Sequence, residues 1–312
     1  MNILILGAGA VGGYFGGRLL QSGADVTFLV RKKREEQLRG NGLVIKSVHG
    51  DFSTSVKTLT AGQGAGRSFD LIILSTKAYH FDNAIRDVEP YVSSHTMLLP
   101  LLNGYSHIET LQDRFGKEKV LGGLCFIEST LNEEGEIIHT SQRHDVVFGE
   151  LNREITPRVK QVESIMDQAN FTSKLSGDIV TEMWNKYIFI TALSGMTTLF
   201  NSSMGPILES PYGKELYLQL LNELSQVALS HGVCLDEKVV DHNFNAAASM
   251  GFHMKSSMLR DMEKKMQVEA EHLQGEFLRL ASRYKLNTPI LKVAYNNLKV
   301  YEVKLREGLA DV

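Results

Sequence analysis

The stretch NILILGAGAVGGYFGGRLLQSG, residues 2–23, decides the fold of the first half of the chain. Its opening, residues 2–7, is a continuous apolar run of the kind found in parallel strands that are buried on both faces. Glycines follow at the end of this run, at Gly7, Gly9 and Gly12, and a helical spacing of apolar residues begins there. The stretch therefore predicts a strand, a tight turn and a helix in succession.

The position of the three glycines between a strand and a helix predicts a dinucleotide-binding loop. Gly7 can make the tight turn, Gly9 can let the backbone approach a pyrophosphate, and Gly12 can let the helix pack on the strand. The other residues of the loop are predicted cofactor contacts as well: Ala8, Ala10 and Val11. A GxGxxG match alone is weak, and the alternative is a glycine-rich turn that binds nothing.

Further apolar runs continue the alternation of strand and helix. Residues 25–30, 69–76 and 95–103 each form such a run and end in a short polar turn. The fold class that this pattern predicts is α/β, with a doubly wound, Rossmann-type parallel sheet whose ligands bind outside the carboxyl ends of the strands. Residues 120–130 and 136–150 alternate around NEEGE, and we expect them to form antiparallel strands at the far edge of this sheet.

Helical periodicity replaces the strand pattern after residue 172. Helices are expected over residues 179–200, 211–231, 256–283 and 289–306. The polar segment LSGD, residues 175–178, is the expected junction. The predicted organisation is a Rossmann-type dinucleotide-binding domain over residues 1–174 and an all-helical, substrate-binding domain over residues 175–312.

The composition is that of a globular protein and excludes several classes of function. The chain has 312 residues, 43% of them hydrophobic and 22% charged, and its 33 basic and 36 acidic residues nearly cancel. This balance gives no whole-chain argument for a nucleic acid or a membrane as partner. Two cysteines, Cys125 and Cys234, are too few for a disulfide framework and lack zinc-ligand spacing. The opening residues have neither a basic leader nor the length of a membrane span, so we expect a cytoplasmic protein.

The motifs of several other enzyme classes are missing from the sequence. There is no HExxH, GxSxG or Walker loop, so a hydrolase or a metalloenzyme has little support. His139 and His144 lie in the expected strand pair and lack a third ligand. No metal site is predicted.

A basic run at the end of the second strand bears on the cofactor. A site specific for NAD would place Asp or Glu there, to hold the ribose 2′-hydroxyl. The chain has Arg31 instead, whose guanidinium suits a 2′-phosphate, and Lys32, Lys33 and Arg34 would add positive potential at the same corner. We therefore expect NADP(H) as the cofactor; the alternative is a solvated charge run on the surface.

Polar groups at two further strand ends, and one lysine in an apolar segment, are candidate site residues. Lys77 and Asn103 follow the third and fourth strands, at the level where the nicotinamide is expected, although both residues are also ordinary in turns. Lys186 lies in EMWNKYIFITAL, an otherwise apolar helical segment, where a lysine must extend to the surface, form an ion pair or accept a lowered pKa. The pattern alone leaves a structural and a functional lysine open.

Over nearly its whole length the chain resembles the ketopantoate reductases (2-dehydropantoate 2-reductases), NADPH-dependent enzymes of pantothenate synthesis. The resemblance rests on motifs in the family order: GAGAVGGYFG at 7–16, Arg31, STKA with Lys77, NG at 103–104, MWNKY with Lys186, and SSMLRDM…VEAEHLQG at 256–275. In the last motif Ser257 and Glu269 stand at the family spacing, and Gly275 follows. The resemblance implies reduction of a 2-oxo acid, ketopantoate, to the 2-hydroxy acid pantoate.

The resemblance also implies roles for individual residues. Lys186 would act as the general acid toward the 2-keto oxygen, and Glu269 would orient both the substrate and the lysine. Asn103 and Ser257 would hydrogen-bond the substrate, and Lys77, with Asn103, would lie on the cofactor side. A hydride that arrives at a ketone carbon leaves alkoxide character on the oxygen, which an ammonium can stabilise and protonate. The structural alternatives are a helix-capping serine for Ser257 and a solvated helical glutamate for Glu269.

The chain departs from the family pattern at two positions of the expected substrate pocket. The family has asparagines four and eight residues after the lysine, where this chain has Ile190 and Ser194. An apolar Ile190 cannot offer an amide to a polar substrate, so another 2-oxo acid with a more apolar side chain competes with ketopantoate. Polar contacts could instead come from the FNSSMG turn: Asn201, Ser202 or Ser203.

A non-catalytic function of the same fold is the alternative from a different class. The chain could be an NADP-binding sensor or scaffold without turnover. Retention of both Lys186 and Glu269 argues against this alternative, because a binding module needs no proton donor in its cleft. The sequence leaves a monomer and a homodimer open.

Overall fold

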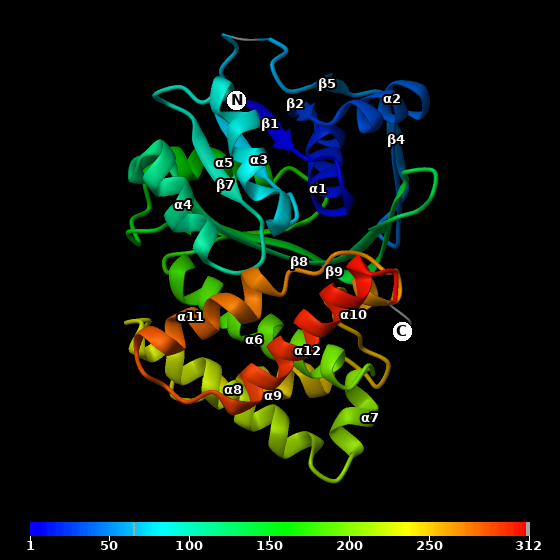
Figure 1. Ribbon diagram of the computed structural model, residues 1–312. Coiled ribbons are helices and arrows are strands. Elements are labelled where there is room, and N and C mark those ends of the chain that lie inside the picture. Colours follow the sequence, from blue (N-terminus) through cyan, green and yellow to red (C-terminus); the bar gives the residue numbers. More distant parts are fainter. Residues whose placement is uncertain (65, 310–312) are drawn as a thin grey trace. The chain divides into compact units, whose positions relative to one another are not determined.

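The computed structural model describes residues 1–64 and 66–309, which fall into two compact units (Figure 1). The first unit comprises Met1–Leu102 and His107–Val180, and the second comprises Asn103–Ser106 and Thr181–Val312. The chain thus passes from the first unit to the second and back within the short segment Asn103–Ser106.

A five-stranded parallel sheet lies in the first unit, with the strand order β5-β2-β1-β6-β7. Its strands are β1 (Asn2–Leu6), β2 (Asp25–Leu29), β5 (Lys57–Leu59), β6 (Leu71–Leu74) and β7 (Met97–Pro100). Every residue of β6 and β7 is buried, as expected for parallel strands covered on both faces. The predicted α/β class and four of the predicted strands are confirmed, whereas the short edge strand β5 was not predicted.

Helices follow most of these strands and cover the sheet. They are α1 (Ala10–Gln21), α2 (Lys32–Asn41), α3 (Phe81–Val88), α4 (Ser106–Phe115) and α5 (Pro157–Met166), with short 3-10 turns at Ala78–His80, Glu89–Tyr91 and Lys117–Lys119. The start of α5 shows how the sequence fixes such a boundary. Thr156 accepts a hydrogen bond from the backbone amide of Val159, and Pro157 occupies the first helical position, where a missing N–H costs nothing.

A second sheet in the first unit corrects one prediction. The long strands β8 (Leu121–Leu131) and β9 (Ile137–Glu150) do pair antiparallel, and Val120, directly before β8, forms an isolated bridge with Leu98 of the edge strand β7, but β8 and β9 are not strands of the parallel sheet. They belong to a separate sheet of order β10-β9-β3-β4, in which β8 also pairs with β9. The other strands are β3 (Leu43–Ser47), β4 (Phe52–Thr54) and β10 (Thr172–Leu175). The prediction was wrong because an antiparallel pair identifies its hairpin partner from the sequence but not the sheet that the hairpin joins.

Helix α1 packs between the two sheets, as Figure 1 shows. Two of its glycines permit this close approach. A Cβ added at Gly16 would lie 2.8 Å from the ring of Phe28 in the parallel sheet, and one added at Gly17 would lie 2.6 Å from Ile45 in the second sheet. The helix and the inner faces of both sheets form one buried core. The hydrophobic effect at this core, about 1.5–3 kcal/mol for each large side chain, therefore holds the glycine loop in place at the start of α1.

The regular structure of the second unit is helical over the described residues 181–309. Its helices are α6 (Ile179–Leu199, which begins in the first unit), α7 (Met204–Glu209), α8 (Gly213–Ser230), α9 (Val239–Ser249), α10 (Ser257–Glu263), α11 (Glu276–Arg283) and α12 (Pro289–Arg306), with a π-helical turn at Glu271–Gly275. The predicted helices at 179–200, 211–231 and 289–306 correspond to α6, α8 and α12. None of the helices in the described part of the chain combines the length and the apolar character needed to cross a membrane.

The predicted single helix over residues 256–283 is wrong. Helix α10 ends at Glu263, Lys265 adopts a left-handed φ of 53°, and the chain then passes through the π turn before α11 begins. A left-handed residue cannot continue a right-handed helix, so α10 cannot extend through Lys265. Apolar residues on both sides of the break have a helical spacing, so the sequence pattern predicts one continuous helix.

Candidate active site

The glycine loop has the geometry of a dinucleotide-binding turn. Gly7 has a φ of +95°, a conformation that favours glycine, and its N–H donates to the carbonyl oxygen of Leu29 at 3.0 Å. A Cβ on Gly12 would lie 2.2 Å from the Gly7 carbonyl oxygen and 2.0 Å from Ser75 Oγ, so only glycine fits at this crossing of helix and strand. A Cβ on Gly9 would meet no atom of the described residues within 4 Å. Gly9 is therefore the point of the loop that is open to a ligand.

Helix α1 offers its N-terminus at this open point. Gly9 is the N-cap, the first turn carries no acidic side chain among residues 10–13, and the leading N–H groups of any helix lack partners within that helix. The partial positive charge at the helix start favours an anion such as a pyrophosphate. The loop residues Gly7, Ala8, Gly9, Ala10, Val11 and Gly12 can therefore hold a dinucleotide.

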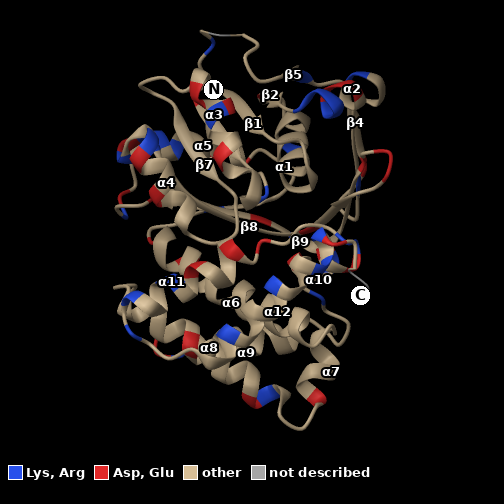
Figure 2. Cartoon of the chain, in the orientation of Figure 1, with Lys and Arg blue, Asp and Glu red and all other residues tan. Residues whose placement is uncertain are grey.

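The basic run after β2 divides into two parts with different roles. Arg31 is the N-cap residue of α2, and Arg31, Lys32 and Lys33 are exposed. Figure 2 shows basic residues, in blue, gathered at α2. Arg34 is half-buried instead: its Nε donates to the Ala8 carbonyl oxygen at 2.9 Å and its Nη1 to the Gly135 carbonyl oxygen at 2.8 Å. Burial lowers the pKa of Arg34. Arg34 thus fixes the backbone of the glycine loop and leaves three exposed cations at the end of β2.

Lys77 lies at the same edge of the parallel sheet. Strands β1 and β6 are paired neighbours, with Leu6 opposite Leu74, so the residues that follow them share one edge. Ser75 donates its hydroxyl to the carbonyl oxygens of Leu6, at 3.1 Å, and Gly7, at 3.2 Å, which ties the end of β6 to the glycine loop. The half-buried Lys77 follows two residues later. Gly7, Arg31 and Lys77 therefore gather at the carboxyl edge, as the sequence predicts.

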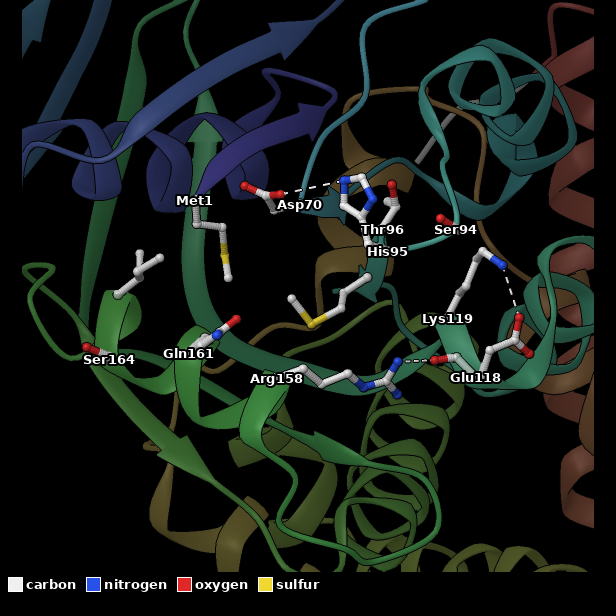
Figure 3. A pocket seen from close by; sticks show the side chains of 12 residues that line it. Met1, Asp70, Ser94, His95, Thr96, Glu118, Lys119, Arg158, Gln161 and Ser164 are labelled. Carbon is white, nitrogen blue, oxygen red and sulfur yellow. Dashed lines mark hydrogen bonds and ion pairs between the residues drawn. The ribbon is translucent and has the colours of Figure 1, made fainter.

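A cavity of about 740 Å³ in the first unit lies at the opposite edge of this sheet (Figure 3). Met1, Asp70 and Thr96, the residues directly before β1, β6 and β7, line it. Figure 3 shows Asp70 and His95, whose side chains lie 3.8 Å apart, on one wall and Arg158 on the other. Because nucleotides bind at the carboxyl ends of parallel strands, this cavity is separate from the candidate cofactor site.

Three histidines of the first unit form a stack without the geometry of a metal site. The rings of His49 and His144 lie 3.8 Å apart at 13°, and Tyr14 Oη lies 2.7 Å from His144 Nδ1. Burial, followed by the neighbouring His49 and His139, lowers the pKa of His144 to about 4. Within residues 1–64 and 66–309, no group of three or more His, Cys, Asp and Glu side chains is arranged to hold a metal ion.

Glu269 of the second unit is not a solvated glutamate. It is buried, with 9% of its surface exposed, and it lies two residues before the π turn. A π turn leaves backbone groups to be satisfied from outside the helix, and such turns are frequent at functional sites. Here Tyr187 of α6 donates its hydroxyl to the Leu273 carbonyl oxygen at 2.9 Å. The π turn that follows Glu269 is therefore fixed to the helix that carries Lys186.

The capping role belongs to Ser256 and not to Ser257. Ser256 Oγ accepts a hydrogen bond from the Leu259 amide at 3.1 Å and lies 2.7 Å from Thr197 Oγ1 of α6. Ser257 is exposed as the first residue of α10. The structural alternative for Ser257, a helix cap, is thereby excluded.

The two departures from the family pattern, Ile190 and Ser194, differ in their burial on α6. Lys186 and Ile190 are one helical turn apart and both half-buried. Ser194, one turn further, is 3% exposed, and its hydroxyl accepts a hydrogen bond from Gln274 Nε2 at 2.8 Å. Ser194 therefore has a partner inside the helical unit, whereas Ile190 keeps part of its side chain accessible.

His272 is a candidate site residue that the sequence analysis missed. Its Nε2 lies 2.7 Å from the Asn103 carbonyl oxygen, and its Nδ1 lies 3.4 Å from Ser106 Oγ. Gly104, with a φ of +84°, lies so close that an added Cβ would be 2.8 Å from His272 Nε2. The second unit thus brings the Asn103 turn together with the segment that carries Glu269. The sequence signal is a histidine three residues after Glu269, within the last of the family motifs.

Comparison with known proteins gives matches over both halves of the chain. Residues 3–153 match the sequence model of the family "Ketopantoate reductase PanE/ApbA", and residues 178–302 match that of "Ketopantoate reductase PanE/ApbA C terminal". The chain is 45% identical over 304 residues to the uncharacterized oxidoreductase YkpB of Bacillus subtilis (strain 168), covering 97% of this chain and 100% of that protein.

Solved structures share the fold. A 2-dehydropantoate 2-reductase from Geobacter metallireducens GS-15 is 27% identical with a TM-score of 0.88, covering 96% of this chain and 99% of that chain. A D-mandelate dehydrogenase in a ternary structure with NADH and anilino(oxo)acetate is 22% identical with a TM-score of 0.89, covering 98% of this chain and 99% of that chain. At 22% identity, the second likeness shows the fold alone.

Proposed function

The chain belongs to the ketopantoate reductase family of oxidoreductases, and from this premise we propose that it reduces a 2-oxo acid to a 2-hydroxy acid with NADPH. Ketopantoate, in pantothenate synthesis, is the first candidate substrate. The observation that carries the proposal is the burial of Glu269 beside the π turn, in a chain that also retains Lys186 and the glycine loop. A carboxylate is costly to bury, and a proton-transfer site gives a reason for that cost.

The proposed chemistry assigns a step to each residue. The nicotinamide, when bound, supplies the hydride. Lys186 donates a proton to the oxygen of the 2-keto group as negative charge develops there, and Glu269 orients the lysine and keeps it charged. Asn103 and Ser257 hold the polar groups of the substrate. An assay of NADPH oxidation against a panel of 2-oxo acids that includes ketopantoate tests the function, and a lack of turnover with every acid would favour the non-catalytic NADP-binding alternative.

The cofactor preference rests on Arg31. The three exposed cations at the end of β2 supply the positive potential that a 2′-phosphate needs, and no acidic residue stands at position 31 to hold a 2′-hydroxyl. The D-mandelate dehydrogenase neighbour was solved with NADH, so the fold alone does not decide between the two nicotinamide cofactors. The residue at this corner is therefore the basis for proposing NADPH.

Arg31→Ala is expected to raise the Michaelis constant for NADPH by roughly 10–100-fold and to leave that for NADH nearly unchanged, because charge-assisted hydrogen bonds to the 2′-phosphate contribute about 1.5–3 kcal/mol. Steady-state kinetics with both cofactors measure the effect. Arg39→Ala removes an exposed arginine further along α2 and is the matched control. Equal use of NADPH and NADH by the unmodified protein would contradict the prediction.

A second candidate, a reductase of a more apolar 2-oxo acid, is favoured by Ile190. This side chain is half-buried one turn after Lys186, where the family pattern has an amide. An apolar wall cannot satisfy a polar substrate group, so it discriminates in favour of an apolar one.

Ile190→Asn is expected to shift the ratio of kcat/KM values toward ketopantoate, and away from apolar 2-oxo acids, by roughly tenfold. Ile190→Leu keeps an apolar side chain of the same size and should keep the original ranking. Competition between pairs of acids at saturating NADPH measures the ratio. An unchanged ranking in Ile190→Asn would show that position 190 does not contact the substrate.

A further inference from the structure

We infer that His272 is a positioning residue for the reaction, which fixes the turn of Asn103 to the segment that carries Glu269. The inference rests on the proposed function, because Asn103 and Glu269 matter as substrate-binding groups only if the chain turns over a 2-oxo acid. His272 itself need not touch the substrate.

The contacts determine which ring nitrogen carries the proton. A backbone carbonyl oxygen can only accept, so His272 Nε2, at 2.7 Å from the Asn103 oxygen, must donate. In the neutral ring Nδ1 is then an acceptor, and the Ser106 hydroxyl at 3.4 Å can donate to it. One imidazole thus binds both ends of the segment Asn103–Ser106.

The segment is shaped to receive this ring. Gly104 has a φ of +84° and no side chain, and either a Cβ or an ordinary φ at this position would prevent the approach of His272. Tyr105 packs its ring against that of Trp184 in α6, with centroids 5.0 Å apart. The turn is therefore held by α6 at Tyr105, and by His272 at Asn103 and at Ser106.

The segment that carries His272 is fixed in turn. Tyr187, next to Lys186 in α6, donates its hydroxyl to the Leu273 carbonyl oxygen at 2.9 Å and lies 3.3 Å from that of His272. Asn103, Lys186 and Glu269 come from three distant parts of the sequence, and His272 and Tyr187 connect those parts. A displacement of about 1 Å in a positioning group can cost about 100-fold in rate.

Burial keeps the ring of His272 in its neutral form. Burial lowers the pKa of His272, whereas the carboxylate of Glu269, the Asn103 carbonyl and Glu276 act in the opposite direction, and Arg279 lowers it further. The pKa of His272 stays below its ordinary value, so near pH 7 the ring is neutral with its proton on Nε2.

Two substitutions separate positioning from simple packing. His272→Phe keeps a ring of similar size but removes the N–H, whereas His272→Gln keeps an N–H donor at a similar distance from the backbone. We expect His272→Phe to lower kcat/KM for the 2-oxo acid by roughly 10–100-fold, largely through KM, and His272→Gln to recover most of this loss. Fluorescence titration should show NADPH binding within a few-fold of the wild type in both, because the glycine loop and Arg31 lie in the first unit and are not changed. His242→Phe, at an exposed histidine of α9, is the matched control.

Amide hydrogen exchange of the segment Asn103–Ser106 gives a readout that does not need turnover. We expect faster exchange there in His272→Phe than in the wild type, and protection close to the wild type in His272→Gln. If the wild type reduces no 2-oxo acid, the proposed function fails while the exchange comparison still decides whether His272 holds the turn. Equal exchange in all variants, or loss of protection with unchanged kcat/KM, would overturn the inference.

Discussion

Lys186→Ala is expected to lower turnover by about 10²–10⁴-fold, the usual range for a positioned general acid, while NADPH binding stays near normal. The lysine lies on a half-buried face of α6, in the second unit, whereas the glycine loop and Arg31 lie in the first. Its loss therefore removes the proton donor without changing the residues proposed to hold the dinucleotide.

Single-turnover kinetics and a fluorescence titration of NADPH, performed on the same variant, separate chemistry from binding. Lys292→Ala, at an exposed lysine of α12, controls for the loss of one positive charge in the helical unit. Near-full turnover in Lys186→Ala would refute the mechanism. A matching drop in NADPH affinity would mean that the lysine serves the cofactor instead.

Glu269→Ala tests whether the lysine works with a partner. If Lys186 and Glu269 act as a unit, the double variant should lose much less than the product of the two single losses. Simple multiplication of the two losses would refute the partnership and leave the role of the lysine standing.

The parallel sheet could be predicted because its strands are buried on both faces. Strands β1, β6 and β7 consist almost wholly of buried apolar residues, so each is a continuous run in the sequence. Strands β4 and β5 have three residues each, with exposed positions among them, and such short mixed segments carry no periodic signal. The membership of β8 and β9 in a second sheet depends on long-range pairing with β3 and β10, which local pattern cannot reveal.

In the candidate site, too, the features set by neighbouring residues in the sequence could be predicted, whereas those set by contacts between distant residues could not. The glycine loop is a local motif, and its turn, its open point and its close crossing all have the geometry that the sequence predicts. The contact of Ser256 with Thr197 and the pairing of Ser194 with Gln274 depend on neighbours 59 and 80 residues away. His272 was missed for the same reason, since its partner Asn103 lies 169 residues earlier in the chain.

Gly12→Ala is expected to have the largest effect on the first unit. A Cβ at this position would lie 2.2 Å from the Gly7 carbonyl oxygen, and a backbone atom cannot rotate away as a side chain can. Helix α1 must then move off β1, and because α1 also packs on the second sheet, the shift disturbs the core of the whole unit. We expect a loss of about 3 kcal/mol or more in the free energy of unfolding, together with loss of NADPH binding.

Alanine substitutions at two other glycines test whether the effect of Gly12→Ala comes from the close approach of α1 to β1. Gly9→Ala meets no atom of the described chain within 4 Å, so it should leave stability unchanged but weaken NADPH binding, because the new methyl group occupies the point where the pyrophosphate is proposed to approach. Gly40→Ala, in an open position of α2, should stabilise the protein by about 0.5–1 kcal/mol and leave binding unchanged. Urea unfolding and fluorescence titration of all three variants give the comparison. If Gly12→Ala unfolds at the same urea concentration as Gly40→Ala, the close approach of α1 to β1 does not constrain the fold, and the glycine loop owes its position to other contacts.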